Sequence, residues 1–487
     1  MPEENTSNIF PAFRAVAETH PDEPALVFPD VTFTYVQLLD LASTFSFRFQ
    51  EAGVDRQSVI AIRSDDLAVV IPSILASALL GARLAMWSDE DLPDQPCETS
   101  HEVVTAHRFS PCKLIEVDAR FSPHLVTSEE KEALWRSEGS VDPVAPWLLF
   151  PQSSLNGDGS AIALSQALVM RRITEFAEAL EAPKVRFASL WPTTSYSFAV
   201  RALAVLLHGG TIVDSALRKQ FLGEKVTWLS APLPKLRQFF AEVEDTGKIR
   251  KLEFAGYGLT DRTVAVLRSG FDELDEVIET AETGLLFVNK YRTEASGNLQ
   301  RSGHALVADL RLESARPDLV STGELFVRPN NPTAFVFAHD VTAPLPLTAN
   351  GWFATGMVAE FSPDGPLRPI KPIDPFTLEI GGASMKASLV QDVIKSCSGI
   401  LDVVVFASPK KHVDELLAFA VFEQDVNRLQ ISELAKHRCV SELGHVFAPA
   451  KIWPIEAIPL TSNYLPDRAA CAEMILAAAK QSQNMTT

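Results

Sequence analysis

Short apolar runs alternate with helix-like segments through the first half of the chain, and this alternation most constrains the fold. Strands are predicted at residues 59–62, 147–150, 187–191, 211–213 and 226–229, and helices at 67–80, 168–180 and 198–208. Such alternation is typical of parallel strands with helices on both faces of the sheet. The sequence therefore predicts an α/β fold.

The pattern changes in the second half of the chain. Residues 298–361 contain short strands separated by turns rich in Pro, Gly and Asn, which predicts a small β-rich lobe. Prolines at 363, 366, 369, 372 and 375 predict a linker. The predicted domains are a large N-terminal domain (1–370, two α/β lobes plus the β-rich lobe), a hinge (371–375), a small α+β C-terminal lid domain (376–480) and a disordered tail (481–487).

Charge and cysteine content exclude several classes of protein. Acidic residues outnumber basic ones 62 to 43, so the net charge of −19 argues against a nucleic-acid partner and against an anionic membrane surface. The five cysteines are widely spaced without a CxxC motif, which indicates neither a zinc site nor a disulfide framework. No signal peptide is evident at the N-terminus. The apolar run from Leu67 contains Pro72 and is short for a membrane span, so we expect a buried helix and a cytoplasmic protein.

The segment 153–166 is the most informative part of the sequence. It is small and polar, follows an apolar strand and precedes a helix, so its backbone N–H groups are suited to bind phosphate. A plain surface loop is the alternative. Its candidate phosphate-binding residues are Ser153, Ser154, Asn156, Gly157, Gly159 and Ser160.

This segment resembles the phosphate loop of the adenylate-forming superfamily, which includes acyl-CoA synthetases, luciferases and peptide-synthetase adenylation domains. Other segments resemble the family's motifs in the same order along the chain. They are residues 33–38 (FTYVQL), 207–213 (LHGGTIV), 252–259 (LEFAGYGL), 280–284 (TAETG), 323–328 (GELFVR), 351–357 (GWFATGM), 398–405 (SGILDVVV) and 459–468 (PLTSNYLPDR). The resemblance implies a large N-terminal domain and a small mobile C-terminal domain.

The resemblance also implies a chemistry and a set of site residues. Family members join a carboxylate to the α-phosphate of ATP with magnesium, then pass the acyl group to CoA, to a carrier-protein thiol or to an amine. The ATP site would include the loop residues above with Thr283, Gly356 and Met357, and Glu282 would be the magnesium-linked glutamate. Asp374 would be the hinge residue. The substrate pocket would include Trp191, Ser195, Tyr196, Gly256 and Tyr257.

Several residues that carry the family's ATP chemistry are replaced. Ser160 stands in place of the phosphate-loop lysine, Met357 in place of the ribose-binding aspartate, and Leu465 in place of the lysine that bridges carboxylate and phosphate. Glu282 is kept, although a glutamate at a strand-to-helix turn also serves as a helix cap. For the aromatic residues of the predicted pocket, core packing is the alternative.

Three functional hypotheses follow. The first is an adenylate-forming fold that has lost or greatly weakened ATP-dependent carboxylate activation and acts as a binding or scaffold partner, for a carrier protein or a pathway enzyme, in biosynthesis. The second is an active ligase that uses ATP and magnesium to activate an acyl, aryl or amino acid. The third is a protein that binds a small carboxylic acid or a thioester without ATP chemistry. No cofactor and no metal is predicted with certainty.

Overall fold

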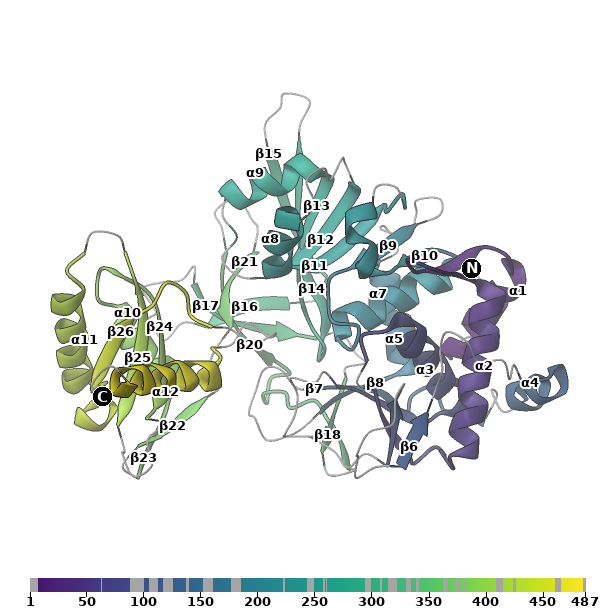
Figure 1. Ribbon diagram of the computed structural model, residues 1–487, viewed down its shortest axis with the longest axis horizontal. Coiled ribbons are helices and arrows are strands. Elements are labelled where there is room, and N and C mark those ends of the chain that lie inside the picture. The colour runs from purple at the N-terminus through teal and green to yellow at the C-terminus, as the bar shows by residue number, and fades with distance from the viewer. Residues whose placement is uncertain are drawn as a thin grey trace. The chain divides into compact units, whose positions relative to one another are not determined.

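The computed structural model describes most of the chain, and its arrangement is shown in Figure 1. The described residues are 8–62, 64–87, 100–104, 113–116, 126–136, 140–151, 161–176, 185–221, 224–242, 249–256, 259, 261–293, 299–306, 309–313, 322–329, 334–338, 341–361, 367–372, 376–380, 382–408, 415–423, 426–459 and 466–484. Apart from two short segments, the chain divides into a compact unit that runs to Ile370 and a second unit from Lys371 onward.

The first unit contains a large sheet whose middle strands are parallel. Among the described residues it has nine strands, in the order β15 (Leu299–Ala305), β14 (Gly284–Thr293), β13 (Phe271–Thr280), β12 (Ile249–Ala255), β11 (Trp228–Pro232), β9 (Arg186–Ser189), β10 (Thr211–Val213), β1 (Pro24–Val27) and β2 (Thr32–Thr34). Pairing is parallel from β13 to β1 and antiparallel at both edges. This confirms the prediction of an α/β fold.

A second sheet of the same unit is built around parallel strands near the N-terminus. Its described strands lie in the order β19 (Val341–Pro344), β18 (Phe335–Ala338), β8 (Ala161–Ser165), β7 (Pro146–Pro151), β4 (Arg83–Met86), β3 (Val59–Ile62), β5 (His101–Val104) and β6 (Lys113–Glu116). The strands β3, β4, β5, β6 and β7 pair in parallel.

Helices lie between these two sheets and also cover the outer face of the nine-stranded sheet. The helices of the first unit are α1 (Ile9–Thr19), α2 (Tyr35–Glu51), α3 (Leu67–Leu80), α4 (Ser128–Trp135), α5 (Gln166–Ile173), α7 (Tyr196–Leu207), α8 (Leu233–Glu242) and α9 (Asp261–Gly270), with the 3-10 turns η3 (Thr174–Phe176) and η4 (Ser215–Gln220). Helices α1, α2, α3, α5 and α7 share one hydrophobic core with both sheets. Helices α8 and α9 pack on the other face of the nine-stranded sheet.

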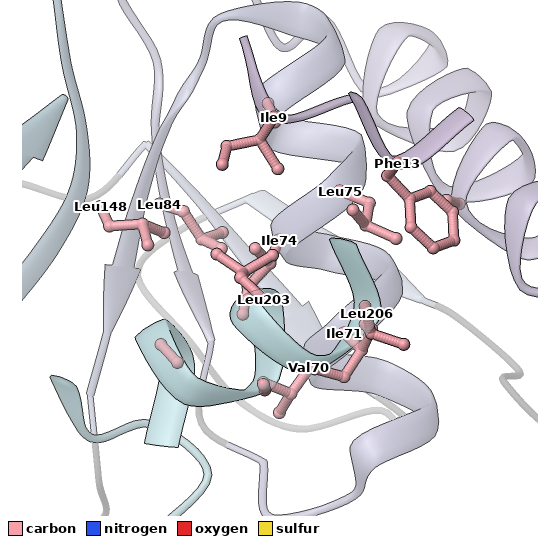
Figure 2. Close-up of a cluster of buried hydrophobic side chains, with 14 of the residues drawn as sticks. Ile9, Phe13, Val70, Ile71, Ile74, Leu75, Leu84, Leu148, Leu203 and Leu206 are labelled. Carbon is pink, nitrogen blue, oxygen red and sulfur yellow. The ribbon is translucent and has the colours of Figure 1, made fainter. Parts of the chain in front are cut away.

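Helix α3 lies at the centre of this core. Every residue of α3 is buried, and Figure 2 shows Val70, Ile71, Ile74 and Leu75 among side chains from α1, β4, β7 and α7. The sequence accounts for its ends, because Asp66 caps the first turn and Gly81, at φ +70°, closes the last. The predicted buried helix is confirmed. Of a second helix, predicted at 168–180, the structure describes α5 up to Ile173 and the 3-10 turn η3 up to Phe176, and residues 177–180 lie outside the described part of the chain.

A third described sheet has four strands. Its strands lie in the order β16 (Asp309–Glu313), β17 (Thr322–Arg328), β20 (Phe353–Phe361) and β21 (Leu367–Pro372). Two sequence predictions are corrected here. The strands of residues 298–361 do not form one lobe, because β15, β18 and β19 join the two larger sheets. The proline-rich segment is not only a linker, because β21 includes Pro369 and Pro372 as strand residues.

The second unit is α+β and has its own core. Its elements are the hairpin β22 (Thr377–Ile380) and β23 (Ala383–Lys386), the sheet of β24 (Ile400–Ala407), β25 (Leu416–Phe422) and β26 (Lys451–Pro454), the helices α10 (Ala387–Lys395), α11 (Arg428–Leu443) and α12 (Arg468–Asn484), and η5 (His445–Phe447). Apolar residues of α10, β24, β25 and α11 form one cluster. The tail predicted to be disordered from residue 481 is corrected in part, since α12 extends to Asn484.

None of the helices in the described part of the chain is long and apolar enough to cross a membrane.

Candidate functional site

The turn between β13 and β14 carries Glu282, the one charged residue of the predicted ATP site that the sequence retains. Thr280 pairs with Gly284 across this hairpin, and the Thr280 hydroxyl accepts a hydrogen bond of 3.1 Å from the backbone N–H of Thr283. Glu282 is 1% exposed. Because a strand and not a helix follows the turn, the alternative that Glu282 caps a helix is wrong.

Arg172, on α5, forms hydrogen bonds with the backbone of this turn. Its guanidinium donates to the carbonyl oxygen of Ala281 at 2.7 Å and to that of Glu282 at 3.0 Å. The same group stacks on the ring of Tyr196, with 5.2 Å between its central carbon and the ring centre. One cation therefore connects α5, the Glu282 turn and the first residue of α7.

Glu175, in η3, contacts the same turn near Arg172. Its carboxylate accepts a hydrogen bond of 3.3 Å from the backbone N–H of Leu285. Burial raises the pKa of Glu175 to about 7, and the nearby Arg172 acts in the opposite direction. The Glu175 carboxyl group therefore changes its charge near neutral pH.

The described residues of the predicted substrate pocket have structural partners. Ser195 is the N-cap of α7, because its hydroxyl accepts from the backbone N–H of Phe198 at 3.2 Å. Tyr196 is buried, with its ring edge-on to Phe150 at 5.9 Å between centres. Trp191 is half-buried, and its indole N–H donates to the hydroxyl of Ser230 at 3.0 Å. Tyr196 therefore packs in the hydrophobic core, which was the alternative to a role in the substrate pocket.

A buried ion-pair cluster lies beside these residues. Arg201, in the middle of α7, contacts the carboxylate of Glu253 through Nε and that of Glu279 through both terminal nitrogens, each at 3.0 Å. The Arg201 side chain is 0% exposed, and those of Glu253 and Glu279 are 4% and 5% exposed. Ser230, the partner of Trp191, donates to Glu253 at 3.3 Å. The predicted pocket residue Trp191 is thus linked through Ser230 to a charged cluster.

The cluster continues along one face of the nine-stranded sheet. Lys251, two residues before Glu253 on β12, pairs with Asp275 at 2.8 Å, and Asp275 also pairs with Arg292 at 2.8 Å. Burial raises the pKa of Glu253, while Arg201 and Lys251 act in the opposite direction. Opposite charges therefore alternate along this face, which offsets the cost of burying them.

The remaining predicted site residues are placed only in part. Gly356, at φ +69°, and Met357 lie in β20, and Met357 is 6% exposed. Gly256 directly follows β12 and is half-buried. Outside the described residues lie Ser153, Ser154, Asn156, Gly157, Gly159, Ser160, Tyr257, Asp374 and Leu465.

We tested whether the described residues fit the ATP and magnesium that the fold family implies. No group of three or more His, Cys, Asp and Glu side chains in the described part of the chain is arranged to hold a metal ion. Glu282 offers a single carboxylate. The thioether of Met357 is a weak acceptor and cannot replace a carboxylate at the ribose hydroxyls. Of the described residues that the resemblance assigns to the nucleotide, Glu282 provides a carboxylate, whereas Met357 provides no strong acceptor.

No sequence motif marks Arg172, Arg201, Glu253 or Glu279 as site residues. A signal was present, because Arg201 interrupts an apolar helix and Glu253 an apolar strand. A charged residue at such a position is rarely buried unless it is paired. The sequence alone does not reveal the partner.

Comparison with known proteins identifies relatives of this chain at low sequence identity. No family model matches the chain. The bassianolide nonribosomal cyclodepsipeptide synthetase of Beauveria bassiana is 20% identical over 433 residues, which cover 82% of this chain. Surfactin synthase subunit 2 of Bacillus subtilis is 22% identical over 503 residues, which cover 94% of it. The chain spans only 14% of the length of each of these relatives.

Solved structures match over nearly the whole chain. A fatty acyl CoA synthetase of Mycobacterium tuberculosis superposes with a TM-score of 0.64 at 17% identity, covering 98% of this chain and 100% of the other. O-succinylbenzoate CoA synthetase of Bacillus subtilis, in complex with ATP and magnesium, superposes with a TM-score of 0.60 at 16% identity, covering 94% and 98%. The chain has the fold of the adenylate-forming superfamily, and the predicted resemblance is confirmed at the level of the fold.

Proposed function

We propose that this chain is an adenylate-forming-ligase-like protein that has lost, or greatly weakened, ATP-dependent activation of carboxylates. It acts as a binding or scaffold partner in a biosynthetic pathway, with a carrier protein or a pathway enzyme as its partner. The observation that carries this proposal is the buried cluster of Arg201, Glu253 and Glu279 beside Trp191 and Ser195.

The cluster is a poor environment for a carboxylic acid. An incoming carboxylate beside Trp191 would meet Glu253 and Glu279, and the guanidinium of Arg201 is already engaged by both of these carboxylates. A buried charge without a partner is strongly unfavourable. An apolar acyl chain would have to displace the ion pair from a well-packed interior.

The replaced residues of the predicted ATP site support the same proposal. Ser160, Met357 and Leu465 replace three residues that the family uses to hold ATP and the carboxylate. Loss of one polar contact to a transition state costs about 3 kcal/mol, or about 10²–10³ in rate. The three losses need not add, but together they predict a deficit of several orders of magnitude.

One observation favours the active-ligase alternative. Glu282 keeps its place in the hairpin turn, and Arg172 fixes both carbonyl groups beside it. A magnesium-linked glutamate would need such rigidity. In that case ATP and magnesium are the cofactors, and the acceptor is CoA or a carrier-protein thiol.

Calorimetry with Mg·ATP distinguishes these functions. We expect the unaltered protein to bind with a Kd weaker than about 1 mM. The double variant S160K/M357D adds a cation for phosphate and an acceptor for ribose, so it should bind about 10-fold more tightly. The matched control S160A/M357L changes the same positions without adding charge and should resemble the unaltered protein.

Two outcomes would overturn the proposal. Saturable binding of Mg·ATP at micromolar concentration by the unaltered protein, together with acid-dependent exchange of pyrophosphate into ATP, would establish the active ligase. Binding of an acyl thioester without nucleotide would instead support a pocket protein without ATP chemistry.

A further inference from the structure

Two cysteines lie where α10 and α11 pack together in the second unit. Cys397 follows the end of α10 and is 2% exposed, and Cys439 lies in α11 and is 0% exposed. Both belong to the hydrophobic cluster of this unit, and both are free thiols. Arg438 donates to the carbonyl oxygen of Ser396 at 3.1 Å, so the residues directly before the two cysteines are in contact.

The two thiols also interact with each other. Burial and, next, the charge of the nearby Cys397 sulfur raise the pKa of the Cys439 thiol to about 12. An electrostatic effect of this kind requires the two sulfurs to be neighbours. A thiol with so high a pKa stays protonated at neutral pH, so Cys439 is not the nucleophile of the pair.

Arg438 distinguishes Cys397 from its neighbour. Hydrogen bonds to Glu442 and, second, to the sulfur of Cys397 raise the pKa of Arg438. A guanidinium beside a sulfur stabilises the thiolate, which is the reactive form. The Arg438 side chain is 43% exposed, and Ser396 and Ser398 on either side of Cys397 are exposed. The Cys397 sulfur therefore lies directly beneath surface residues, where a small oxidant has a short path to it.

We propose that Cys397 and Cys439 form a redox-sensitive dithiol, which hydrogen peroxide converts to a disulfide between α10 and α11. First, the Cys397 thiolate attacks the peroxide: an S–O bond forms, the O–O bond breaks, and the released hydroxide takes up the proton lost by Cys397. Second, the Cys439 sulfur attacks the sulfenic acid on Cys397: the S–S bond forms, the S–O bond breaks, and water leaves with the proton of Cys439. The two thiols lose two electrons, and the peroxide gains them as it becomes water.

The disulfide closes a loop that contains β24, β25 and most of α11. A link across a loop of this size restricts the unfolded chain and thereby stabilises the folded one. Oxidation therefore stabilises the second unit. This inference goes beyond the proposed function and does not depend on it, because it involves neither nucleotide nor acyl ligand.

Peptide mapping of the unaltered protein after treatment with hydrogen peroxide is the direct test. We expect one pair of peptides joined through Cys397 and Cys439, lighter by two hydrogen atoms than the separate peptides and absent after reduction with dithiothreitol. The variant C97S/C112S/C471S keeps this pair alone, and its oxidised form should melt about 5–15 °C higher than its reduced form.

Single substitutions separate the roles of the two sulfurs. In Cys439→Ser the reaction should stop at a sulfenic acid on Cys397, which dimedone labels. In Cys397→Ser the Cys439 thiol should stay unmodified, because it remains protonated. Arg438→Met should react with peroxide about 5–10-fold more slowly than the unaltered protein, whereas Arg438→Lys keeps a positive charge and should lose less.

Several outcomes would overturn the proposal. Failure of either thiol to react, or oxidation of both to sulfinic acids without a joined peptide, would show that the two are not a redox pair. A linked protein that melts below the reduced one would show that the bond does not fit the packing of α10 on α11. Equal reaction of the two single-cysteine variants with peroxide would show that Arg438 does not select Cys397.

Discussion

Gly284 is the residue with the least freedom at the candidate site. Its φ of +84° is unfavourable for any residue with a side chain, and a Cβ there would lie 3.2 Å from Nε of Arg172 and 3.5 Å from the carboxylate of Glu175. The Glu282 turn therefore depends on the absence of one methyl group.

Gly284→Ala should lower the free energy of unfolding by about 2–3 kcal/mol, because backbone strain and crowding act together. Gly351→Ala is the matched control, since φ is +77° there but nothing lies within 4 Å of the added Cβ. It should cost about 1–2 kcal/mol, from strain alone. Urea unfolding measures both. Equal losses in the two variants would mean that the contact with Arg172 does not matter.

The raised pKa of Glu175, beside the Glu282 turn, predicts that the stability of the folded protein depends on pH. Its pKa is raised from 4.5 to about 7, so between these values the folded state binds a proton that the unfolded state has released. The contribution of Glu175 to stability is therefore present below pH 4.5 and is lost as the pH rises toward 7. Glu175 is exposed to solvent, which screens its charge, so we expect only about 1 kcal/mol.

Glu175→Gln checks the sign of this effect. Glutamine resembles the protonated acid and does not titrate, so the variant should lose less stability than the unaltered protein between pH 4.5 and 7.5. Melting temperatures across this range measure the difference. Parallel curves for the two proteins would show that the Glu175 carboxyl group does not titrate there.

At the scale of single elements, helix ends show how local sequence fixes structure. Thr34 and Gln37 form a reciprocal capping box at the start of α2, and Thr127 and Glu130 form another at the start of α4. These contacts join residues three apart, so local sequence is sufficient to predict them. Ser195 caps α7 through its hydroxyl alone, without a reciprocal side chain at Phe198, although the resemblance assigned it to the substrate pocket.

Ser195→Ala separates these two roles. Loss of the cap should reduce the free energy of unfolding by about 1 kcal/mol, and Ser195→Asp, which also caps, should retain nearly all of it. Urea midpoints compare the three proteins. If both variants unfold like the unaltered protein but differ from it in the binding of an acyl ligand, Ser195 belongs to the pocket after all.

At the scale of the whole molecule, the second unit has the properties of an independent domain. Its core joins α10, α11, β24 and β25 without residues from the first unit. About 110 residues with their own core are enough to fold alone.

Residues 376–487 expressed alone should therefore unfold in one cooperative thermal transition, with a mixed α/β circular dichroism spectrum. The same transition should appear in the full chain as a separate step. A fragment that melts gradually, without a near-ultraviolet signal, would mean that its structure depends on the first unit.

Features that depend on neighbours in the chain were predictable from the sequence. The helix at 67–80 and the alternation of strands and helices arise from local periodicity, and the structure confirms them. The resemblance of the ordered motifs to a known family predicted the overall fold, which solved structures match. Predictions from the sequence were wrong where pairing partners are distant. The strands of residues 298–361 join three different sheets, and a strand follows Glu282 where a helix was one alternative.

The residues beside the predicted pocket became evident from the folded chain alone. Arg201 is 52 residues from Glu253 and 78 from Glu279 in the sequence, and no local pattern relates a charge in a helix to charges on two strands. A buried charge is unfavourable alone and tolerable when it is paired, so the role of each residue depends on its contact with the others. That contact results from the packing of α7 on the sheet, which places Arg201 against β12 and β13.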